Sequence, residues 1–167
     1  AGVLRYIGQD RQGRPTLLLL ADRAMPFLTA KHRDRALLYV VKRIEPVATA
    51  AGASGFALMV AMTEAFDWDL DLVWLQAARS RLATEAPGYG SKLQALYLLH
   101  PTTFVRNALS VARAFLSDKD YAIIHAMEEP DTELSRFFDL RAIKLPQGVA
   151  VRGVTNVPER EPDPPLP

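Results

Sequence analysis

Three histidines are the first side chains in this sequence whose chemistry could serve a metal site or acid–base catalysis. His32 stands in a charged stretch, His125 alternates with apolar residues, and His100 ends an apolar run. A metal site would need a further ligand such as Glu128, and the local spacing of these residues fits no ligand pattern. Buried histidines are usually satisfied by hydrogen bonds, so we expect structural histidines and no bound metal. An enzyme using His100 and His125 is the least favoured interpretation, because no nucleophile completes the pair.

Acidic residues and glycines offer two further kinds of site, and both are incomplete. Asp67, Asp69 and Asp71 lie in DWDLD beside an expected helix start, where capping and the helix dipole account for carboxylates. The GASG stretch that ends at Gly55 precedes an apolar run, whereas a phosphate-binding glycine loop precedes a helix. Ser54 lies before the same run and not on a strand-to-helix elbow. We therefore expect no nucleotide, no other cofactor and no serine nucleophile.

The composition indicates one globular domain and fits a reducing compartment. Of the 167 residues, 49% are hydrophobic and 23% are charged, as in domains with a core of their own. The formal net charge is +1 and the basic residues are spread among acids, so we expect no nucleic-acid partner. Cysteine is absent, which excludes disulfides, thiolate catalysis and cysteine-bound zinc. No apolar run reaches the roughly 18 to 20 residues that span a bilayer.

The sequence changes character near its end. The stretch VPEREPDPPLP combines prolines with charges and cannot supply a core. We therefore expect a folded domain over residues 1–150 and a proline-rich tail or linker over residues 151–167.

The positioning elements follow from apolar periodicity. Apolar runs of strand length, bounded by turn residues, occupy Thr16–Asp22, Gly55–Met62, Lys92–His100 and Asp120–Met127. Helical spacing or capping signals occupy Lys31–Gly52, Asp69–Gly90, Thr103–Ser117 and Asp131–Leu140. Pro46 is expected to kink the first helix or end it early. The alternation of strand and helix predicts an α/β fold with a mainly parallel sheet and helices packed on it.

The helix expected over 103–117 carries a broad apolar stripe. Its members are Phe104, Val105, Ala108, Leu109, Ala112, Phe115 and Leu116. The stripe can pack on the sheet as core, or it can cover a cavity that holds an apolar ligand. Periodicity does not separate these alternatives, and packing as core is the more frequent one.

His100 introduces this helix. Pro101 enforces a turn after the strand, and Thr102 or Thr103 can cap the helix through a side-chain oxygen. We expect His100 to form hydrogen bonds within this joint or to line the mouth of a pocket together with Thr102 and Thr103.

Several motifs occur together in the order found in one known family. GQDRQGRP followed by an apolar strand resembles the opening of the CRAL-TRIO (Sec14-like) lipid-binding domain. LQALYLLHPTTFVRNAL resembles the strand–His-Pro-Thr–helix joint of its BNIP-2 and Cdc42GAP homology (BCH) branch. Further matches are ALLYVVKRIEPVA, DLVWLQAA, FLSDKDYAIIHAM and LRAIKLPQGV. The resemblance runs from about Gly8 to Val149 and covers nearly the whole expected domain.

The resemblance implies a function without catalysis. In the family the sheet forms the floor of an apolar pocket, and the helix that matches Phe104–Leu116 acts as a movable gate. The implied ligand is a phospholipid or a prenyl or acyl chain, with a transient membrane surface as a partner. The BCH branch adds an alternative, a scaffold that binds small Rho-type GTPases or their regulators. The implied location is the cytoplasm, with peripheral association with membranes.

This sequence departs from the family pattern in three respects. The helical N-terminal subdomain of typical Sec14-like proteins has no counterpart in the given sequence, and we expect either that it was trimmed or that, as in the BCH branch, it never existed. The basic residues that bind phosphoinositides in the yeast-type members have no counterpart that we can place. Arg23–Pro26 is only weakly similar to a GTPase-contact stretch of the BCH branch.

Residues from the strands and from the gate-like helix form the expected pocket wall. The strand candidates are Leu18, Leu20, Phe56, Leu58, Val60, Tyr97 and Leu99. The helix candidates are Phe104, Ala108, Leu109, Ala112 and Phe115. Because side chains alternate along a strand, the strand candidates cannot all face one pocket.

Overall fold

A five-stranded sheet forms the centre of the computed structural model, which describes residues 3–24, 32–62 and 89–158. Its strands are β1 (Leu4–Gln9), β2 (Pro15–Leu20), β3 (Phe56–Ala61), β4 (Leu93–Leu99) and β5 (Ile124–Met127). They lie side by side in chain order, with β1 antiparallel to β2 and the other neighbours parallel. The sheet confirms the predicted α/β class.

Helices and a second, two-stranded sheet surround this centre. The helical segments are α1 (Ala21–Ala24), α2 (Arg33–Ala50), η2 (Gly52–Ser54), α4 (Tyr89–Lys92), α5 (Thr103–Ala112), α6 (Asp118–Ala122), α7 (Pro130–Glu133) and η3 (Leu134–Arg136). The small parallel sheet pairs β6 (Lys144–Pro146) with β7 (Thr155–Val157).

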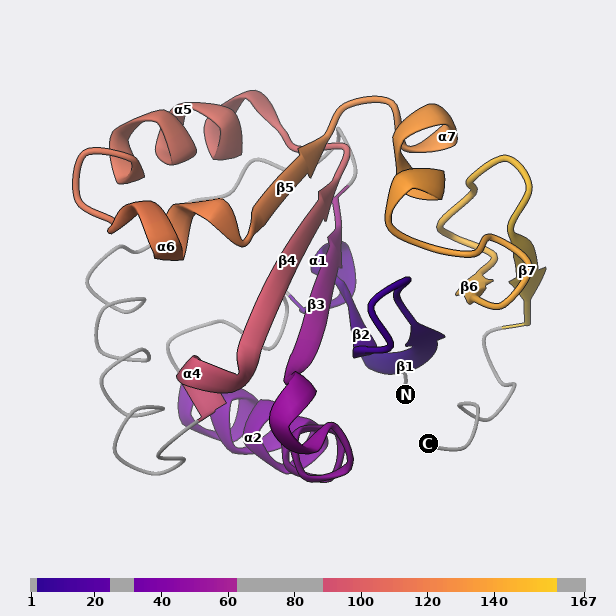
Figure 1. The fold of residues 1–167 in the computed structure, drawn as a ribbon, viewed down its shortest axis with the longest axis horizontal. Helices are drawn as coiled ribbons and strands as arrows, with labels where there is room; N and C mark the ends of the chain where they lie inside the picture. Colours follow the sequence, from indigo (N-terminus) through magenta and orange to yellow (C-terminus); the bar gives the residue numbers. More distant parts are fainter. Residues whose placement is uncertain (1–2, 25–31, 63–88, 159–167) are drawn as a thin grey trace.

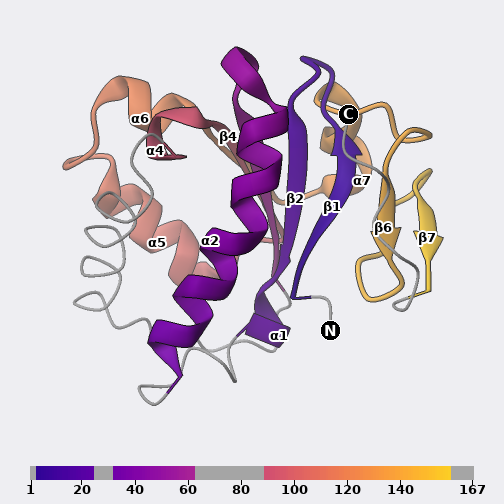
Figure 2. The same cartoon turned by 90° about the horizontal axis from the view of Figure 1, so that it is seen from below.

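The strand order determines which face each helix covers. Parallel strands in chain order are joined by crossovers that are almost always right-handed, so the crossover helices lie on one face of the sheet. Figures 1 and 2 show α2 and α5 on one side, with α7, β6 and β7 on the other. We call these sides the helix face and the C-terminal face.

The C-terminal face carries the largest part of the core. Alternate strand residues such as Leu18, Met59 and Tyr97 pack there against Phe138 and Leu145 of the C-terminal segment, and all five are buried. Burying one such side chain contributes about 1.5 to 3 kcal/mol to the free energy of unfolding. The C-terminal segment therefore covers this face of the sheet and adds to the stability of the domain.

On the helix face, α2 covers the β1–β3 half of the sheet. Val47 and Ala48 of α2 pack with Leu17 and Phe56 from the strands. Pro46 was predicted to kink this helix or end it early, and the helix does not end there: α2 continues to Ala50 with Pro46 exposed.

A proline and a glycine mark the entrances of two strands. Pro15 begins β2, a position that tolerates a residue without an N–H. Before β3, Gly55 has a φ of 70°, and a Cβ atom there would collide with the backbone carbonyl of Lys92. The GASG stretch therefore serves strand entry and close packing.

Some predicted element boundaries were wrong. The strand predicted over 120–127 begins only at Ile124, because Ser117 caps the short helix α6 ahead of it. The helix predicted over 131–140 breaks up into α7 and η3. Of the helix predicted over 69–90, residues 69–88 lie outside the described residues, as do Asp67, Asp69 and Asp71. The three strands β1, β6 and β7 were not predicted.

The folded part extends beyond the boundary predicted at residue 150. Val151 and Val154 are buried in the core of the C-terminal face, and Val157 is buried in β7. These valines recur every three residues and tie the segment to the domain. Residues 159–167 of the expected tail lie outside the described residues.

Candidate functional site

The GQDRQGRP motif forms a buried ionic centre at the turn between β1 and β2. The carboxylate of Asp10 accepts hydrogen bonds from the backbone N–H groups of Gln12 (2.9 Å) and Arg14 (3.0 Å). Its other oxygen accepts from Arg14 Nε at 2.6 Å and from the Tyr97 hydroxyl at 3.1 Å. A carboxylate with four donors is fully satisfied, so the motif stabilises the fold and leaves no group for catalysis.

Tyr97 joins this centre to the core of the C-terminal face. Its hydroxyl also accepts a hydrogen bond from Arg14 Nη2 at 3.1 Å, and its ring packs against His125, Phe137 and Phe138. Burial is the main cause that raises the pKa of Tyr97, and the neighbouring Asp10 carboxylate adds to it. Tyr97 therefore remains a neutral structural residue.

His125 is a stacking partner in the same aromatic group. Its ring lies 5.4 Å from that of Tyr97 and 4.7 Å from that of Phe137, measured between centroids. Burial lowers the pKa of His125, and the nearby Arg14 guanidinium lowers it further. The neutral form is favoured, which fits the structural role predicted for this residue.

The His100 joint connects β4 to α5. The His100 N–H donates to the Met127 carbonyl at 3.0 Å, and its φ of 51° is unusual for a residue other than glycine. Pro101 is buried, and Thr102 caps α5 by accepting from the Val105 N–H at 3.3 Å. The hydroxyl of Thr103 instead accepts from Arg106 Nη2 at 3.0 Å. Of the two predicted capping residues, Thr102 is the one that caps.

Helix α5 divides its apolar residues between two stripes. The inner stripe of Val105, Leu109 and Ala112 is half-buried, and its first two members pack against the strand residues Val60 and Leu98. The outer stripe, one residue away around the helix, contains Phe104, Ala108 and Val111. Phe115 lies beyond the helix, which ends at Ala112 and not at the predicted Ser117. Phe104 is 40% exposed, Val111 62% and Phe115 84%.

The helix face of the sheet carries a row of aliphatic residues that stay partly exposed. Leu58, Leu96 and Ile124 are register partners across β3, β4 and β5, and each is half-buried. Their neighbours on the C-terminal face, Met59 and Tyr97, are completely buried. The row lies beside the inner stripe of α5, in one cluster with Val60 and Leu98. We call Leu58, Leu96 and Ile124 the aliphatic row.

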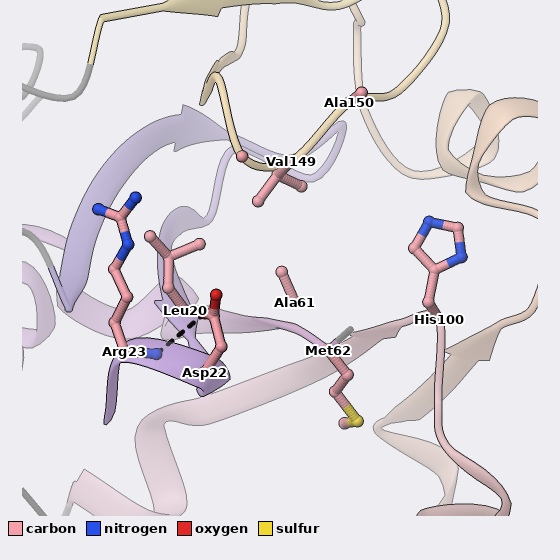
Figure 3. Close-up of a pocket in the computed structure, with 9 residues that line it drawn as sticks. Leu20, Asp22, Arg23, Ala61, Met62, His100, Val149 and Ala150 are labelled. Carbon is pink, nitrogen blue, oxygen red and sulfur yellow. Dashed lines mark hydrogen bonds between the residues drawn. The ribbon is translucent and has the colours of Figure 1, made fainter. Parts of the chain in front are cut away.

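A separate small pocket lies at the carboxyl ends of β2, β3 and β4. Its volume is about 100 Å³. Figure 3 shows Arg23 and His100 on opposite sides of it, with Val149 and Ala61 between them. The lining residues are Leu20, Asp22, Arg23, Ala61, Met62, His100, Gly148, Val149 and Ala150. Pockets for small organic ligands usually measure about 300 to 1,000 Å³, so this pocket is too small for a lipid.

The predicted wall residues divide among three environments. Leu18, Leu20, Tyr97 and Leu99 are buried on the C-terminal face, against the C-terminal segment. Leu58, Val60 and Leu109 come together on the helix face under α5. Ala112 is half-buried at the end of α5.

The remaining wall candidates lie elsewhere. Phe56 is buried on the helix face but packs under α2, and Phe104, Ala108 and Phe115 face solvent. The alternation of side chains along the strands explains this division.

Sequence reasoning missed the residues that complete the group under α5. They are Leu96, Leu98, Ile124 and Val105, which pack around Val60 and Leu109. Strand alternation indicates that Leu96 and Leu98 share a face, but it does not say which face the helices cover. The predicted wall residues of β4 were Tyr97 and Leu99, and both lie on the other face.

Within residues 3–24, 32–62 and 89–158, no group of three or more His, Asp or Glu side chains could hold a metal ion. No helix in this part of the chain is both long and apolar enough to cross a membrane.

Comparison with known proteins adds the family. Residues 13–152 match the family described as "Divergent CRAL/TRIO domain". A crystal structure of Sfh5 has a similar fold, with a TM-score of 0.57 at 11% sequence identity. The likeness covers 96% of this chain and 57% of the Sfh5 chain, so this chain spans little more than half the length of that protein. No curated protein sequence matches. The chain therefore belongs to the divergent CRAL/TRIO domain family, whose members typically bind lipids and are generally not enzymes.

Proposed function

We propose that this protein binds a lipid hydrocarbon chain without catalysis, on the helix face of the sheet beneath α5. The observation that carries the proposal is the partial exposure of the aliphatic row in the middle of a sheet. Central-strand leucines are normally covered, as they are on the C-terminal face of this same sheet. A hydrocarbon chain lying along Leu58, Leu96 and Ile124 would cover the part of this row that is exposed in the described structure.

The chemistry of this surface suits a hydrocarbon more than a polar ligand. Every member of the cluster under α5 is apolar, from Val60 and Leu98 on the strands to Val105 and Leu109 on the helix. Each methylene group that leaves water contributes about 0.8 kcal/mol to the binding free energy. The affinity for a phospholipid acyl chain or a prenyl chain would therefore grow with the length of the buried chain and need few polar contacts.

Helix α5 is the proposed gate. The structure leaves none of its residues fully buried, so moving it exposes little core. The outer stripe would contact a membrane surface while the inner stripe stays over the ligand. We infer a cytoplasmic protein that associates peripherally with membranes when it exchanges its ligand.

Native mass spectrometry of the purified protein tests this proposal. The expected spectrum contains a protein–lipid complex, and an emptied sample should regain lipid from liposomes. Protein that is repeatedly recovered empty and extracts nothing from liposomes of several compositions would refute lipid binding.

A second proposal follows the resemblance to the BCH branch, and in particular to the C-terminal domain of ganglioside-induced differentiation-associated protein 2. The chain would then be a scaffold for small Rho-type GTPases or their regulators. Exposed Leu38 and Tyr39 on α2 favour a protein contact on the helix face. The two functions share a site if the bound chain is the prenyl group of a GTPase.

Pull-downs with prenylated and unprenylated GTPases separate these possibilities. Binding of the prenylated form alone would point to the aliphatic row, and binding of both forms would point to a protein surface. Binding of neither form would remove the scaffold proposal and leave lipid binding in place.

A further inference from the structure

The small pocket at the carboxyl ends of β2, β3 and β4 is separate from the proposed lipid site. Its lining includes Leu20, Ala61 and Val149, which belong to the core of the C-terminal face. The aliphatic row lies on the opposite face of the sheet. In open α/β sheets, ligands commonly bind outside the carboxyl ends of the parallel strands. The position of this pocket therefore suits a ligand other than the hydrocarbon chain.

The size of the pocket restricts that ligand to a small ion or molecule. The volume is about 100 Å³, and a cavity of about 10 to 15 Å³ by the same measure holds one water molecule. A phosphate ion fits within such a volume, whereas an acyl chain or a nucleotide does not.

Two side chains with nitrogen donors lie on opposite sides of the pocket. Figure 3 shows Arg23 on one side and His100 on the other, with Val149 and Ala61 between them. Arg23 is half-buried and His100 is exposed. The guanidinium presents a fork of donors that matches phosphate oxygens, and an imidazole has at least one N–H to donate in either protonation state. The pair suits a tetrahedral anion, whose oxygens point in different directions.

The backbone of His100 supports a binding role for its ring. The φ of 51° lies in the region that favours glycine, yet this position carries an imidazole. The His100 N–H donates to the Met127 carbonyl, whereas the ring has no hydrogen-bond partner among the described residues. Strained positions that are occupied by residues other than glycine cluster at functional sites.

We propose that this pocket binds a small soluble phosphate anion between Arg23 and His100. The buried apolar lining lowers the local dielectric and strengthens the contact between the anion and the guanidinium. Asp22 also lines the pocket, and its Oδ1 accepts a hydrogen bond from the Arg23 N–H at 2.9 Å. The charge of this carboxylate opposes the anion and limits the affinity. The inference does not depend on the proposed lipid binding.

Amide chemical shifts measured by NMR during a titration with inorganic phosphate test the proposal on the full chain. We expect saturable shifts at His100, Gly148 and Ala150, and no such shifts with potassium chloride at the same ionic strength. Vesicles that contain phosphatidic acid form a separate arm, because a lipid headgroup carries the same phosphate chemistry. Shifts with these vesicles alone, phosphate shifts confined to residues outside the pocket, or no shifts at all would overturn the proposal.

Two substitutions and one control assign binding to the pocket. Arg23→Gln should raise the Kd for phosphate by about ten-fold or more, as expected for the loss of a charge-assisted hydrogen bond. His100→Gly removes the ring, suits the backbone conformation and should also weaken binding. Arg141→Gln removes the same charge as the Arg23 change, from an exposed residue that does not line the pocket, and should bind as the wild type does. Equal affinities of the two arginine variants would overturn the proposal.

A third substitution changes the affinity in the opposite direction. Asp22→Asn removes the like charge and keeps a side-chain oxygen for the Arg23 N–H, so it should lower the Kd by up to about five-fold. A gain in affinity cannot come from misfolding, so this variant decides the matter even if thermal unfolding shows that Arg23→Gln is poorly folded. An Asp22 variant that binds phosphate no more tightly than the wild type would overturn the proposal.

Discussion

At the scale of single residues, the polar groups of this protein serve the fold. Asp10, Arg14 and Tyr97 form a closed set of hydrogen bonds between a turn and the middle of the sheet. The Asp10 side chain is almost completely buried, so its charge depends on these partners. The family-like GQDRQGRP motif is therefore explained by the burial of one carboxylate.

Asp10→Ala should destabilise the protein strongly. The change leaves the half-buried Arg14 guanidinium without its carboxylate partner and two backbone N–H groups without their acceptor, and we expect a loss of about 3 to 5 kcal/mol in the free energy of unfolding. Tyr97→Phe removes only a hydroxyl and should cost about 1 kcal/mol. Urea denaturation followed by circular dichroism measures both, and equal losses would mean that the carboxylate is not the central group.

Glycine should replace His100 better than alanine does. The φ of 51° is costly for any residue with a Cβ atom and is natural for glycine. Both variants lose the imidazole, so we expect His100→Gly to be more stable than His100→Ala by about 1 kcal/mol in thermal unfolding. Identical stabilities would show that the ring contacts, and not the backbone, determine the role of this residue.

The stability of the protein should fall as the pH drops below about 6.5, the ordinary pKa of histidine. The pKa of His125 is lowered in the folded state, so the unfolded chain binds the proton more tightly and acid favours unfolding. The loss continues until the pH reaches the folded-state pKa. His125→Phe retains an aromatic ring beside Tyr97 and should flatten this part of the profile. An unchanged profile in that variant would assign the titration to another group.

At the scale of elements, the strand–helix order and the mainly parallel sheet were predictable from the sequence. The face of the sheet that each helix or segment covers was not. Apolar runs bounded by turn residues identified β2, β3 and β4 to within two residues. β1 was missed because its sequence LRYIGQ mixes charge with apolar residues, and β6 and β7 because each has only three residues. Their stability comes from tertiary packing, which local periodicity does not contain.

The predicted pocket wall is divided between the two faces of the sheet. The sequence indicates which residues of β4 share a face of the sheet. It does not indicate which face α5 covers and which face the C-terminal segment covers. The same limit applies to α5, whose broad stripe becomes an inner and an outer stripe only once the helix is placed on the sheet.

A bulky residue in the aliphatic row should block ligand binding while the fold stays intact. Leu96 is half-buried on the helix face, so Leu96→Trp has room to occupy the proposed lipid site, and we expect less co-purified lipid at nearly unchanged stability. Ala95, its neighbour, is fully buried on the opposite face, and Ala95→Leu should cost about 1 to 3 kcal/mol through overpacking. Native mass spectrometry and thermal unfolding of both variants test this contrast. A strong loss of stability in the Leu96 variant would mean that the row is filled core.

At the scale of the whole molecule, the domain has two unlike sides. The C-terminal face is closed by a segment that includes Phe138 and Leu145, whereas the helix face retains partly exposed aliphatic residues under a weakly attached helix. In the proposed function, the C-terminal face supplies stability while the helix face opens. The arrangement suits a carrier that must release its cargo without unfolding.

The C-terminal segment should be needed for stability beyond residue 150. A chain ending at Ala150 loses the buried Val151, Val154 and Val157 together with β7, and we expect it to be less stable than a chain ending at Pro158 by more than about 3 kcal/mol. Urea denaturation of the two chains measures the difference. Equal stabilities would restore the domain boundary at residue 150.

The central claim is that a hydrocarbon chain lies between the helix face of the sheet and α5. Photo-crosslinking with a phospholipid that carries a diazirine in its acyl chain, followed by peptide mass spectrometry, tests it most directly. We predict label on peptides that contain Leu96, Ile124 or Leu109, and loss of that label when unlabelled lipid is added in excess. Label confined to the C-terminal segment over 134–157, or label that excess lipid does not remove, would contradict this account.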